Sequence, residues 1–201
     1  ELSWDQRRPP EAFQPVIDEV GERPSTGTRQ RMLTAVDDFA RRHGFEQREV
    51  GVYARPGVRR RYMEGRRRGH ECLGLGPAAH GLRLADDRVC RQSQPSDPTS
   101  YLEKPTRAPE SSNLSAREFL FVRICQGLEL TDGMSVVGLH EQFDECFGAD
   151  CVDELVGALS SDAPEFIRRQ GKADEERIVP TADGLTSPDR VATRVAPLIP
   201  S

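Results

Sequence analysis

Apolar residues recur at helical spacing between Ser25 and Gly44. This spacing predicts an amphipathic helix, because positions three and four residues apart share one face of a helix. Ser25 or Thr26 can cap its first turn, and Gly44 ends it. The recurring apolar residues are Met32, Leu33, Val36, Phe39 and Ala40.

The pattern then changes to one that is typical of strands. Residues 45–54 predict a strand that Pro56 and Gly57 terminate. Residues 72–76, Cys-Leu-Gly-Leu-Gly, predict a short buried strand that runs into a glycine turn. A helix, a strand, a connection and a second strand in this order predict an α/β fold with a largely parallel sheet.

Residues 105–114 are rich in proline and small polar residues, a composition that is typical of linkers. Directly after them, Ser115 and Glu118 form a capping box that opens a helix. We therefore expect a first domain over residues 1–104 and a second domain over residues 115–201. The apolar residues of the opening helix are Phe119, Leu120, Val122, Ile124 and Leu128.

The second domain continues with two further predicted helices, over residues 135–147 and 150–159. Short apolar runs at 166–167 and 177–179 then flank a polar turn, which predicts a β-hairpin. Three helices followed by a two-stranded wing are typical of a winged-helix domain. The helix over 135–147 carries three acids and no Lys or Arg, so a nucleic-acid partner is not expected.

Composition limits the class of protein. A chain of 201 residues with 36% hydrophobic content can form one full domain or two small ones. No apolar run approaches the ~20 residues of a membrane-spanning helix, and the first residues do not resemble a signal peptide. The chain does not begin with Met, and we expect it to be a piece of a longer protein.

Charge is spread unevenly in a chain whose net charge is -5. Residues 55–70 hold seven arginines and one acid, Glu64, and therefore carry +6. Such a segment can be a solvated loop, a surface for nucleic acid, or a bidentate clamp for carboxylates or phosphates. Few aromatic residues interleave with the arginines, which disfavours stacking on single-stranded bases. The arginines are Arg55, Arg59, Arg60, Arg61, Arg66, Arg67 and Arg68.

Five cysteines at irregular spacing do not form a disulfide framework and indicate a reducing, cytoplasmic compartment. Cys146 and Cys151 lie near His140, which raises the question of a metal site. Both cysteines fall on predicted apolar helix faces, so we expect them to be buried and free of metal. The remaining cysteines are Cys72, Cys90 and Cys125.

Several blocks of the chain together resemble one protein family. The chain resembles the oxygen-independent coproporphyrinogen III oxidases and their relatives, the radical SAM haem chaperones. The resemblance runs from about residue 15 to the wing and corresponds to the C-terminal half of those proteins. The blocks that carry it are Glu49 to Gly57, Leu73 to Gly81, Asp97 to Leu102, and Ser115 to Gly133.

The resemblance implies a fold and a cofactor site. It implies that the first domain is the C-terminal part of a partial (β/α) radical SAM barrel and that the second is a helical, winged-helix-like domain. Ligands of such barrels bind at the carboxyl ends of the strands. Ala54, Gly74, Gly76 and His80 would then approach S-adenosylmethionine. The glycines allow close approach of the main chain, although they can also serve only to make a tight turn. His80 could be a proton donor, a haem ligand or a polar cap on the turn.

The chain departs from the family pattern in two places. Radical SAM chemistry needs a Cys-x-x-x-Cys-x-x-Cys loop that holds a [4Fe–4S] cluster, and no such spacing occurs here. Residues 62–67 also replace the His-Asn-x-x-Tyr-Trp segment of the haem chaperones. Arg66, Arg67 and Arg68 then remain as anion contacts, for example with the propionates of haem or a porphyrin.

Two hypotheses of different class result. In the first, the chain is the C-terminal part of a radical SAM oxidoreductase or haem chaperone, and its partner is the cluster-bearing N-terminal half. In the second, it is a standalone, non-catalytic module that binds an anionic ligand or a protein through its arginine segment. The sequence that precedes Glu1 distinguishes the two.

Overall fold

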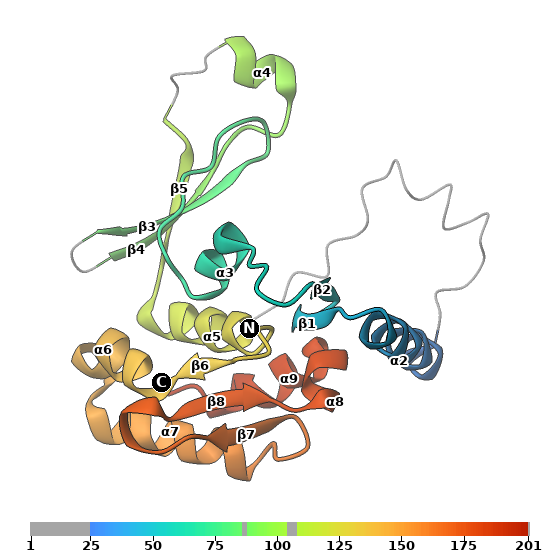
Figure 1. Ribbon diagram of the computed structural model, residues 1–201. Helices are drawn as coiled ribbons and strands as arrows, with labels where there is room; N and C mark the ends of the chain where they lie inside the picture. Colours follow the sequence, from blue (N-terminus) through green and yellow to red (C-terminus); the bar gives the residue numbers. More distant parts are fainter. Residues whose placement is uncertain (1–24, 86–87, 104–107, 201) are drawn as a thin grey trace.

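The computed structural model of the protein describes residues 25–85, 88–103 and 108–200 (Figure 1). The proline-rich lead-in before Ser25, and residues 104–107 around the expected linker, lie outside the described residues. Among the described helices, none combines the length and the apolar character needed to cross a membrane.

Helix α2 (Thr26–Arg42) confirms the first predicted helix. The Ser25 hydroxyl accepts a hydrogen bond from the Thr28 N–H over 3.2 Å and thereby caps the first turn. The predicted apolar face exists but is largely uncovered. Ala40 is buried, whereas the exposed fractions are 57% for Met32, 50% for Val36 and 57% for Phe39.

The predicted single strand over 45–54 is wrong, because the segment folds back on itself. Strands β1 (Glu46–Glu49) and β2 (Val52–Ala54) form an antiparallel hairpin in which Ala54 pairs with Glu46. The chain reverses at Gly51, whose φ of 69° is readily adopted by glycine. A connection this short can join only antiparallel strands, since a parallel pair needs a crossover of about a dozen residues or more.

The arginine-rich segment contains a short helix, α3 (Arg61–Arg67). After it, the strand predicted over 72–76 is reduced to one isolated bridge between Cys72 and Leu82. Leu73 and Leu75 are 71% and 74% exposed, so the predicted burial of this segment is wrong. Its alternating leucines face solvent because the neighbouring positions form a turn.

A three-stranded antiparallel sheet follows, in the order β3-β4-β5, and projects from the rest of the molecule in Figure 1. It comprises β3 (His80–Ala85), β4 (Arg88–Ser93) and β5 (Glu110–Leu114), with helix α4 (Pro98–Glu103) between β4 and β5. Residues 110–114, expected to be linker, therefore form a strand that pairs with β4. The expected boundary between the domains stays a prediction.

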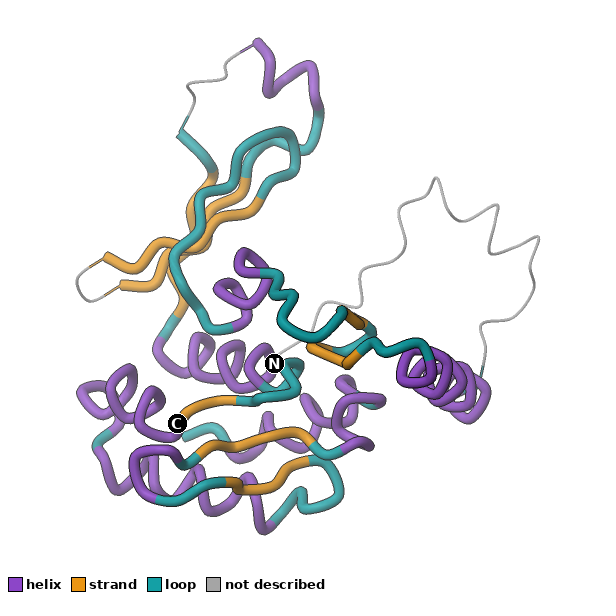
Figure 2. The backbone as a smooth tube through the Cα atoms, viewed as in Figure 1, coloured by secondary structure: helices purple, strands orange, loops and turns teal. Residues whose placement is uncertain are grey.

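Every strand pair among the described residues is antiparallel, so the expectation of a largely parallel sheet is wrong. Figure 2 shows the strands gathered in small separate sheets. The mixed α/β character is confirmed. The 17 residues between the two predicted strands, 55–71, are long enough for a parallel crossover, so the spacing by itself did not exclude either strand direction.

The C-terminal region follows the predicted order of helices and hairpin. Helix α5 (Ala116–Gly127) opens with the predicted capping box, in which Ser115 and Glu118 bond each other's main-chain N–H. Helices α6 (Val136–Phe147) and α7 (Ala149–Ser161) follow, and Gly148 with a φ of 84° separates them. These helices confirm the three that were predicted, which begin at Ser115 and cover residues 135–147 and 150–159.

The predicted hairpin consists of β7 (Ile167–Gln170) and β8 (Arg177–Pro180), with a 3₁₀ turn η2 (Ala173–Glu175) between them. A short strand that was not predicted, β6 (Met134–Ser135), pairs with β8 on its other side, so the sheet order is β6-β8-β7. The chain ends in α8 (Ala182–Thr186), α9 (Pro188–Val195) and the 3₁₀ turn η3 (Ala196–Leu198).

One hydrophobic core lies among these C-terminal elements. Burial of large apolar side chains is its main stabilising term, at about 25 cal/mol per Å² removed from water. Leu82, Val89 and Leu114 of the projecting sheet pack against this core and tie the sheet to it. The fully buried large side chains include Leu120, Ile124, Leu139, Phe143, Leu159, Phe166 and Ile178.

Candidate functional site

The glycine turn over residues 74–80 is held by hydrogen bonds from the segment that leaves β4. Gln94 donates from Nε2 to the Gly74 carbonyl oxygen over 3.2 Å. The main-chain N–H groups of Ala78 and Gln94 donate to Pro95 and Ala79, each over 2.8 Å. The turn is therefore a built feature whose main chain has a defined course.

Gly74 and Gly76 have different reasons to be glycine. A Cβ at Gly74 would lie 2.7 Å from the carbonyl carbon of His80, so the fold itself requires glycine there. At Gly76, φ is 102° and nothing lies within 4 Å of an added Cβ. The Gly76 N–H donates to the Tyr101 hydroxyl over 3.2 Å. Open space therefore lies beside the Gly76 Cα, while its N–H is already bonded to Tyr101.

The four residues expected to contact a cofactor do not all meet. His80 begins β3 and is exposed, and its Nδ1 lies 3.0 Å from the Ser93 hydroxyl. It stands beside Gly74 and Gly76 in the turn. Ala54 ends β2, and Figure 1 shows α3 between the β1–β2 hairpin and the three-stranded sheet. The structure therefore brings together Gly74, Gly76 and His80, and it holds Ala54 apart from them.

The three arginines expected to bind an anion have different surroundings. Arg67 forms ion pairs with Glu49, at 3.4 Å, and with Glu129. Arg68 lies 2.5 Å from the Asp132 carboxylate. The Arg66 guanidinium stands 6.0 Å from the centre of the Tyr62 ring. Arg67 and Arg68 thus have carboxylate partners within the chain, whereas the Arg66 guanidinium lies near the aromatic ring of Tyr62.

Glu49 belongs to a cluster of ion pairs that also contains Arg60, Arg67 and Glu129. It is only 4% exposed, and its two oxygens contact Arg60, at 2.9 Å, and Arg67. A buried carboxylate is stable only when charges or donors compensate it, and two guanidinium groups do so here. Burial raises the pKa of Glu129, and Arg67 opposes the rise. The arginine segment is thereby anchored to β1 and to the end of α5.

Arg123 extends the cluster into the C-terminal core. Its Nη1 donates to the main-chain carbonyl oxygen of Arg67 over 2.6 Å, and its Nε donates to Gln142 over 3.0 Å. Burial lowers the pKa of the Arg123 guanidinium to about 10, and the charge of Arg68 acts in the same direction. Gly69, with a φ of 73°, leaves room for this side chain, because an added Cβ would overlap it.

Main-chain bonds join the same two regions. The Val50 N–H donates to the Glu129 carbonyl oxygen over 2.8 Å, and the Thr131 N–H donates to Arg48 over 3.0 Å. The segment that follows α5 therefore lies along β1 as a short strand-like partner, with a bridge between Glu49 and Leu130. Charge pairs and main-chain bonds together fasten the N-terminal elements to the C-terminal core.

Two features of the sequence indicate this cluster. Glu49 lies in an otherwise strand-like run, and Arg123 interrupts the apolar run of α5. A charged residue at a predicted core position needs a partner, and that need indicates an ion pair. The sequence does not identify the partners of Glu49 and Arg123, because contacting residues such as Arg67 and Arg123 are 56 positions apart.

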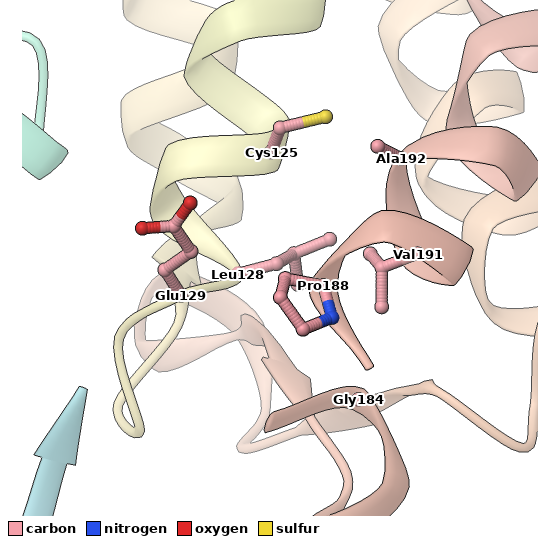
Figure 3. Close-up of a pocket in the computed structure, with 7 residues that line it drawn as sticks. All are labelled: Cys125, Leu128, Glu129, Gly184, Pro188, Val191 and Ala192. Carbon is pink, nitrogen blue, oxygen red and sulfur yellow. The ribbon is translucent and has the colours of Figure 1, made fainter. Parts of the chain in front are cut away.

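A small hollow lies between the end of α5 and α9, with an empty volume of about 260 Å³ that includes open solvent (Figure 3). Burial raises the pKa of the Cys125 thiol, which lines this hollow, to about 12. A thiol that stays protonated is a poor nucleophile and a poor metal ligand. The lining residues are Cys125, Leu128, Glu129, Gly184, Pro188, Val191 and Ala192.

The described part of the chain contains no group of three or more His, Cys, Asp or Glu side chains that could hold a metal ion. His140 instead contacts Asp144, at 2.8 Å, and Asp153, at 3.4 Å. The predicted burial of Cys146 is wrong, because this thiol is exposed. The neighbouring Phe147 is partly buried and packs against the core, with its ring 6.3 Å from that of Phe143.

Comparison with solved structures reveals a related fold. The chain is similar to coproporphyrinogen III oxidase (HemN) from Escherichia coli, which is described as a radical SAM enzyme. The TM-score is 0.54 at 14% sequence identity, and the match covers 86% of this chain and 42% of the E. coli chain. This chain thus spans about two fifths of the length of that protein.

The likeness establishes the fold relationship alone. No protein-family profile matches the chain, and no curated protein matches its sequence.

Proposed function

We propose that this chain is the C-terminal half of a radical SAM protein of the oxygen-independent coproporphyrinogen III oxidase and haem chaperone family, acting in tetrapyrrole metabolism. The observation that carries the proposal is the agreement of two separate lines. The order of sequence blocks between residues 49 and 133 resembles this family, and the fold over 86% of the chain is similar to that of HemN.

The proposal assigns the first domain to the C-terminal part of a (β/α) radical SAM barrel. The second domain is assigned to a winged-helix-like fold, which the order α5, β6, α6, α7, β7 and β8 supports. Helices α6 and α7 carry Asp and Glu but no Lys or Arg. A winged-helix domain with such helices is suited to protein contacts better than to the phosphates of DNA.

The residues present fit part of the cofactor set. The open space at the Gly76 Cα, beside His80, fits close approach of S-adenosylmethionine, whose bound form would supply the radical chemistry. The five cysteines do not fit a [4Fe–4S] cluster, because none of their spacings matches Cys-x-x-x-Cys-x-x-Cys. The proposal therefore assigns the cluster to the N-terminal half and no catalysis to this chain alone.

Reading the gene upstream of the Glu1 codon is the direct test. An in-frame Cys-x-x-x-Cys-x-x-Cys supports the proposal, whereas a start codon preceded by a promoter contradicts it. The longer product, reconstituted anaerobically, should show [4Fe–4S] absorbance and bind S-adenosylmethionine, and the 201-residue chain should show no cluster.

Gly76→Ala tests the cofactor contact in that longer product. Its matched control is Gly44→Ala, because both glycines have positive φ, 102° and 75°, and both have open space where Cβ would lie. Weaker S-adenosylmethionine binding in Gly76→Ala alone supports the contact. Equal binding in the two variants assigns the turn a structural role.

Porphyrin titration tests the anion contacts, which remain Arg66, Arg67 and Arg68. Since Arg67 and Arg68 have internal partners, Arg66→Ala is the variant that separates ligand binding from folding. We expect it to weaken binding without changing thermal stability, and unchanged affinity would remove the proposed contact.

A second candidate function is a standalone, non-catalytic module that binds a protein or an anionic ligand. The uncovered apolar face of α2 favours it, because such a face fits a protein partner. The upstream gene sequence separates this candidate from the first.

A further inference from the structure

Helix α4 contacts the glycine turn through the side chain of Tyr101. The Tyr101 hydroxyl oxygen accepts the Gly76 N–H over 3.2 Å, although the two residues are 25 positions apart in the sequence. Tyr101 is half-buried, whereas the next residue, Leu102, is 72% exposed. The tyrosine is thus the residue of this pair that reaches from α4 to the turn.

The start of α4 is itself fixed by hydrogen bonds. The Asp97 carboxylate accepts the N–H and the hydroxyl of Ser100, each over 2.7 Å. The Tyr101 N–H donates to the Asp97 carbonyl oxygen over 3.1 Å. The bond from the Ser100 hydroxyl, together with that from its N–H, lowers the pKa of the Asp97 carboxyl. Tyr101 therefore extends from a capped first turn, which limits where its hydroxyl can lie.

Gly76 is held differently from the rest of the turn. The segment that leaves β4 bonds the two ends of the turn, at Gly74 and at Ala78 and Ala79. Gly76 lies between these points, and its carbonyl oxygen accepts the Ala79 N–H over 3.2 Å. Because glycine has no Cβ, steric contacts do little to keep its φ at 102°. The bond to Tyr101 restrains the peptide that precedes Gly76.

Ala78 shows that the surroundings impose the shape of this turn. Its φ of 57° lies in the left-handed region, which is unfavourable for a residue with a Cβ. Such a conformation persists only where neighbouring contacts determine it. The loss of one of these contacts should therefore change the conformations that the turn adopts.

We propose that Tyr101 is a positioning residue that holds the Gly76 main chain in the shape that receives S-adenosylmethionine. The inference rests on the proposed function, which assigns the open space beside Gly76 to this cofactor. The hydroxyl contributes to affinity without touching the cofactor, because a turn that already has its bound shape loses little freedom on binding. One neutral hydrogen bond of this kind corresponds to an effect on affinity of about threefold to tenfold.

Tyr101→Phe in the longer product is the test, because it removes the hydroxyl oxygen and keeps the ring. The affinity for S-adenosylmethionine, titrated after anaerobic reconstitution, should fall about threefold to tenfold while the cluster content stays unchanged. Tyr62→Phe is the matched control. Tyr62 is 60% exposed on α3, and its ring is the part that lies near Arg66, so this variant should bind the cofactor like the wild type.

Two further measurements distinguish positioning from general support of the fold. Hydrogen exchange of the peptide that contains Gly76 should be faster in Tyr101→Phe than in the wild type before cofactor is added. Asp97→Ala should weaken cofactor binding through Tyr101, so it should have little further effect when Tyr101 is already Phe. Additive effects of the two substitutions would contradict a role that passes through the hydroxyl.

The outcomes separate this inference from the proposed function. If the wild-type product binds S-adenosylmethionine and Tyr101→Phe binds it equally well, the positioning role is wrong and the proposed function stands. Tighter binding by Tyr101→Phe would mean that the hydroxyl competes with the cofactor for the Gly76 N–H, which also overturns the inference. If the wild-type product does not bind the cofactor, or no longer product is encoded, both proposals fall.

Discussion

Arg123 Nη1 lies 2.6 Å from the main-chain carbonyl oxygen of Arg67 and so joins helix α5 to the end of α3. The same guanidinium bonds Gln142 of α6, while the Arg67 side chain turns toward Glu49 and Glu129. Segments distant in sequence thus meet through one buried cation. The stability of the molecule should be sensitive to this point.

Replacing Arg123 by Ala should lower the free energy of unfolding by about 2–4 kcal/mol, because it leaves a cavity and an unpaired carbonyl oxygen. The control is Arg194→Ala, which removes an exposed arginine 3.7 Å from Glu165. This variant should change the free energy of unfolding by about 0.5 kcal/mol or less. Urea denaturation of the two variants measures the difference. Equal small effects would mean that the Arg123 contacts do not fasten the two regions.

Burial raises the pKa of Glu129 above its ordinary 4.5, and Arg67 only partly offsets this. The folded chain then binds this proton more tightly than the unfolded chain. The stabilising contribution of Glu129 is complete below pH 4.5 and declines as the pH rises through the folded-state pKa. Glu129→Gln should lack that decline, which unfolding free energies measured across this pH range would show.

Glu176 provides the contrast to Glu129. Its hydrogen bond from Arg169 lowers its pKa, so its contribution is lost as the pH falls through the folded-state pKa. The Glu129→Gln and Glu176→Gln difference curves should therefore slope in opposite directions. Parallel curves would contradict the assignment for Glu129.

Gly133→Ala should be strongly destabilising, by about 3 kcal/mol or more. Its φ is 59°, and an added Cβ would overlap the Ile178 carbonyl oxygen and lie 2.7 Å from the Val179 Cα. Gly148→Ala has a similar φ of 84° but open space, so it should cost only about 1–2 kcal/mol. Comparing the thermal unfolding of the two variants separates the cost of the steric overlap with the main chain at Gly133 from the cost of a positive φ in a residue other than glycine.

Thiol labelling of the native chain should distinguish Cys146 from Cys125. Cys146 is exposed and should react rapidly with a disulfide reagent. Cys125 is buried, and its pKa of about 12 keeps it protonated, so it should react only after unfolding. Mass spectrometry of the labelled peptides locates the modified residue, and rapid native labelling of Cys125 would show that its surroundings open readily.

Local patterns predicted much of the C-terminal region. The Ser115–Glu118 capping box, the helices after it and the hairpin around residues 171–174 were confirmed, because caps, period and turn residues act over a few positions. The N-terminal sheet was predicted less well. Gly51 reverses the chain where one strand was expected, and residues 110–114 form a strand despite their linker composition.

The candidate site also contains one part that the sequence predicted and one that it did not. The turn over Gly74 to His80 could be located from its glycines, although its exposed leucines were expected to be buried. The partners of Arg67 and Arg68 could not be located, since Glu49, Glu129 and Asp132 reach them only after the chain has folded.

Local sequence patterns specify the helices, their caps, the glycine turn, the uneven charge and the lack of the cluster motif. Each follows from residues that are adjacent or one helical turn apart. Three other features depend on how the folded chain brings distant segments together: Arg67 pairs with Glu49, Arg123 donates to the Arg67 carbonyl oxygen, and the apolar face of α2 is largely exposed. A charge or an apolar face needs a partner that is close in space, and such a partner can be many residues away in the sequence, where local patterns do not identify it.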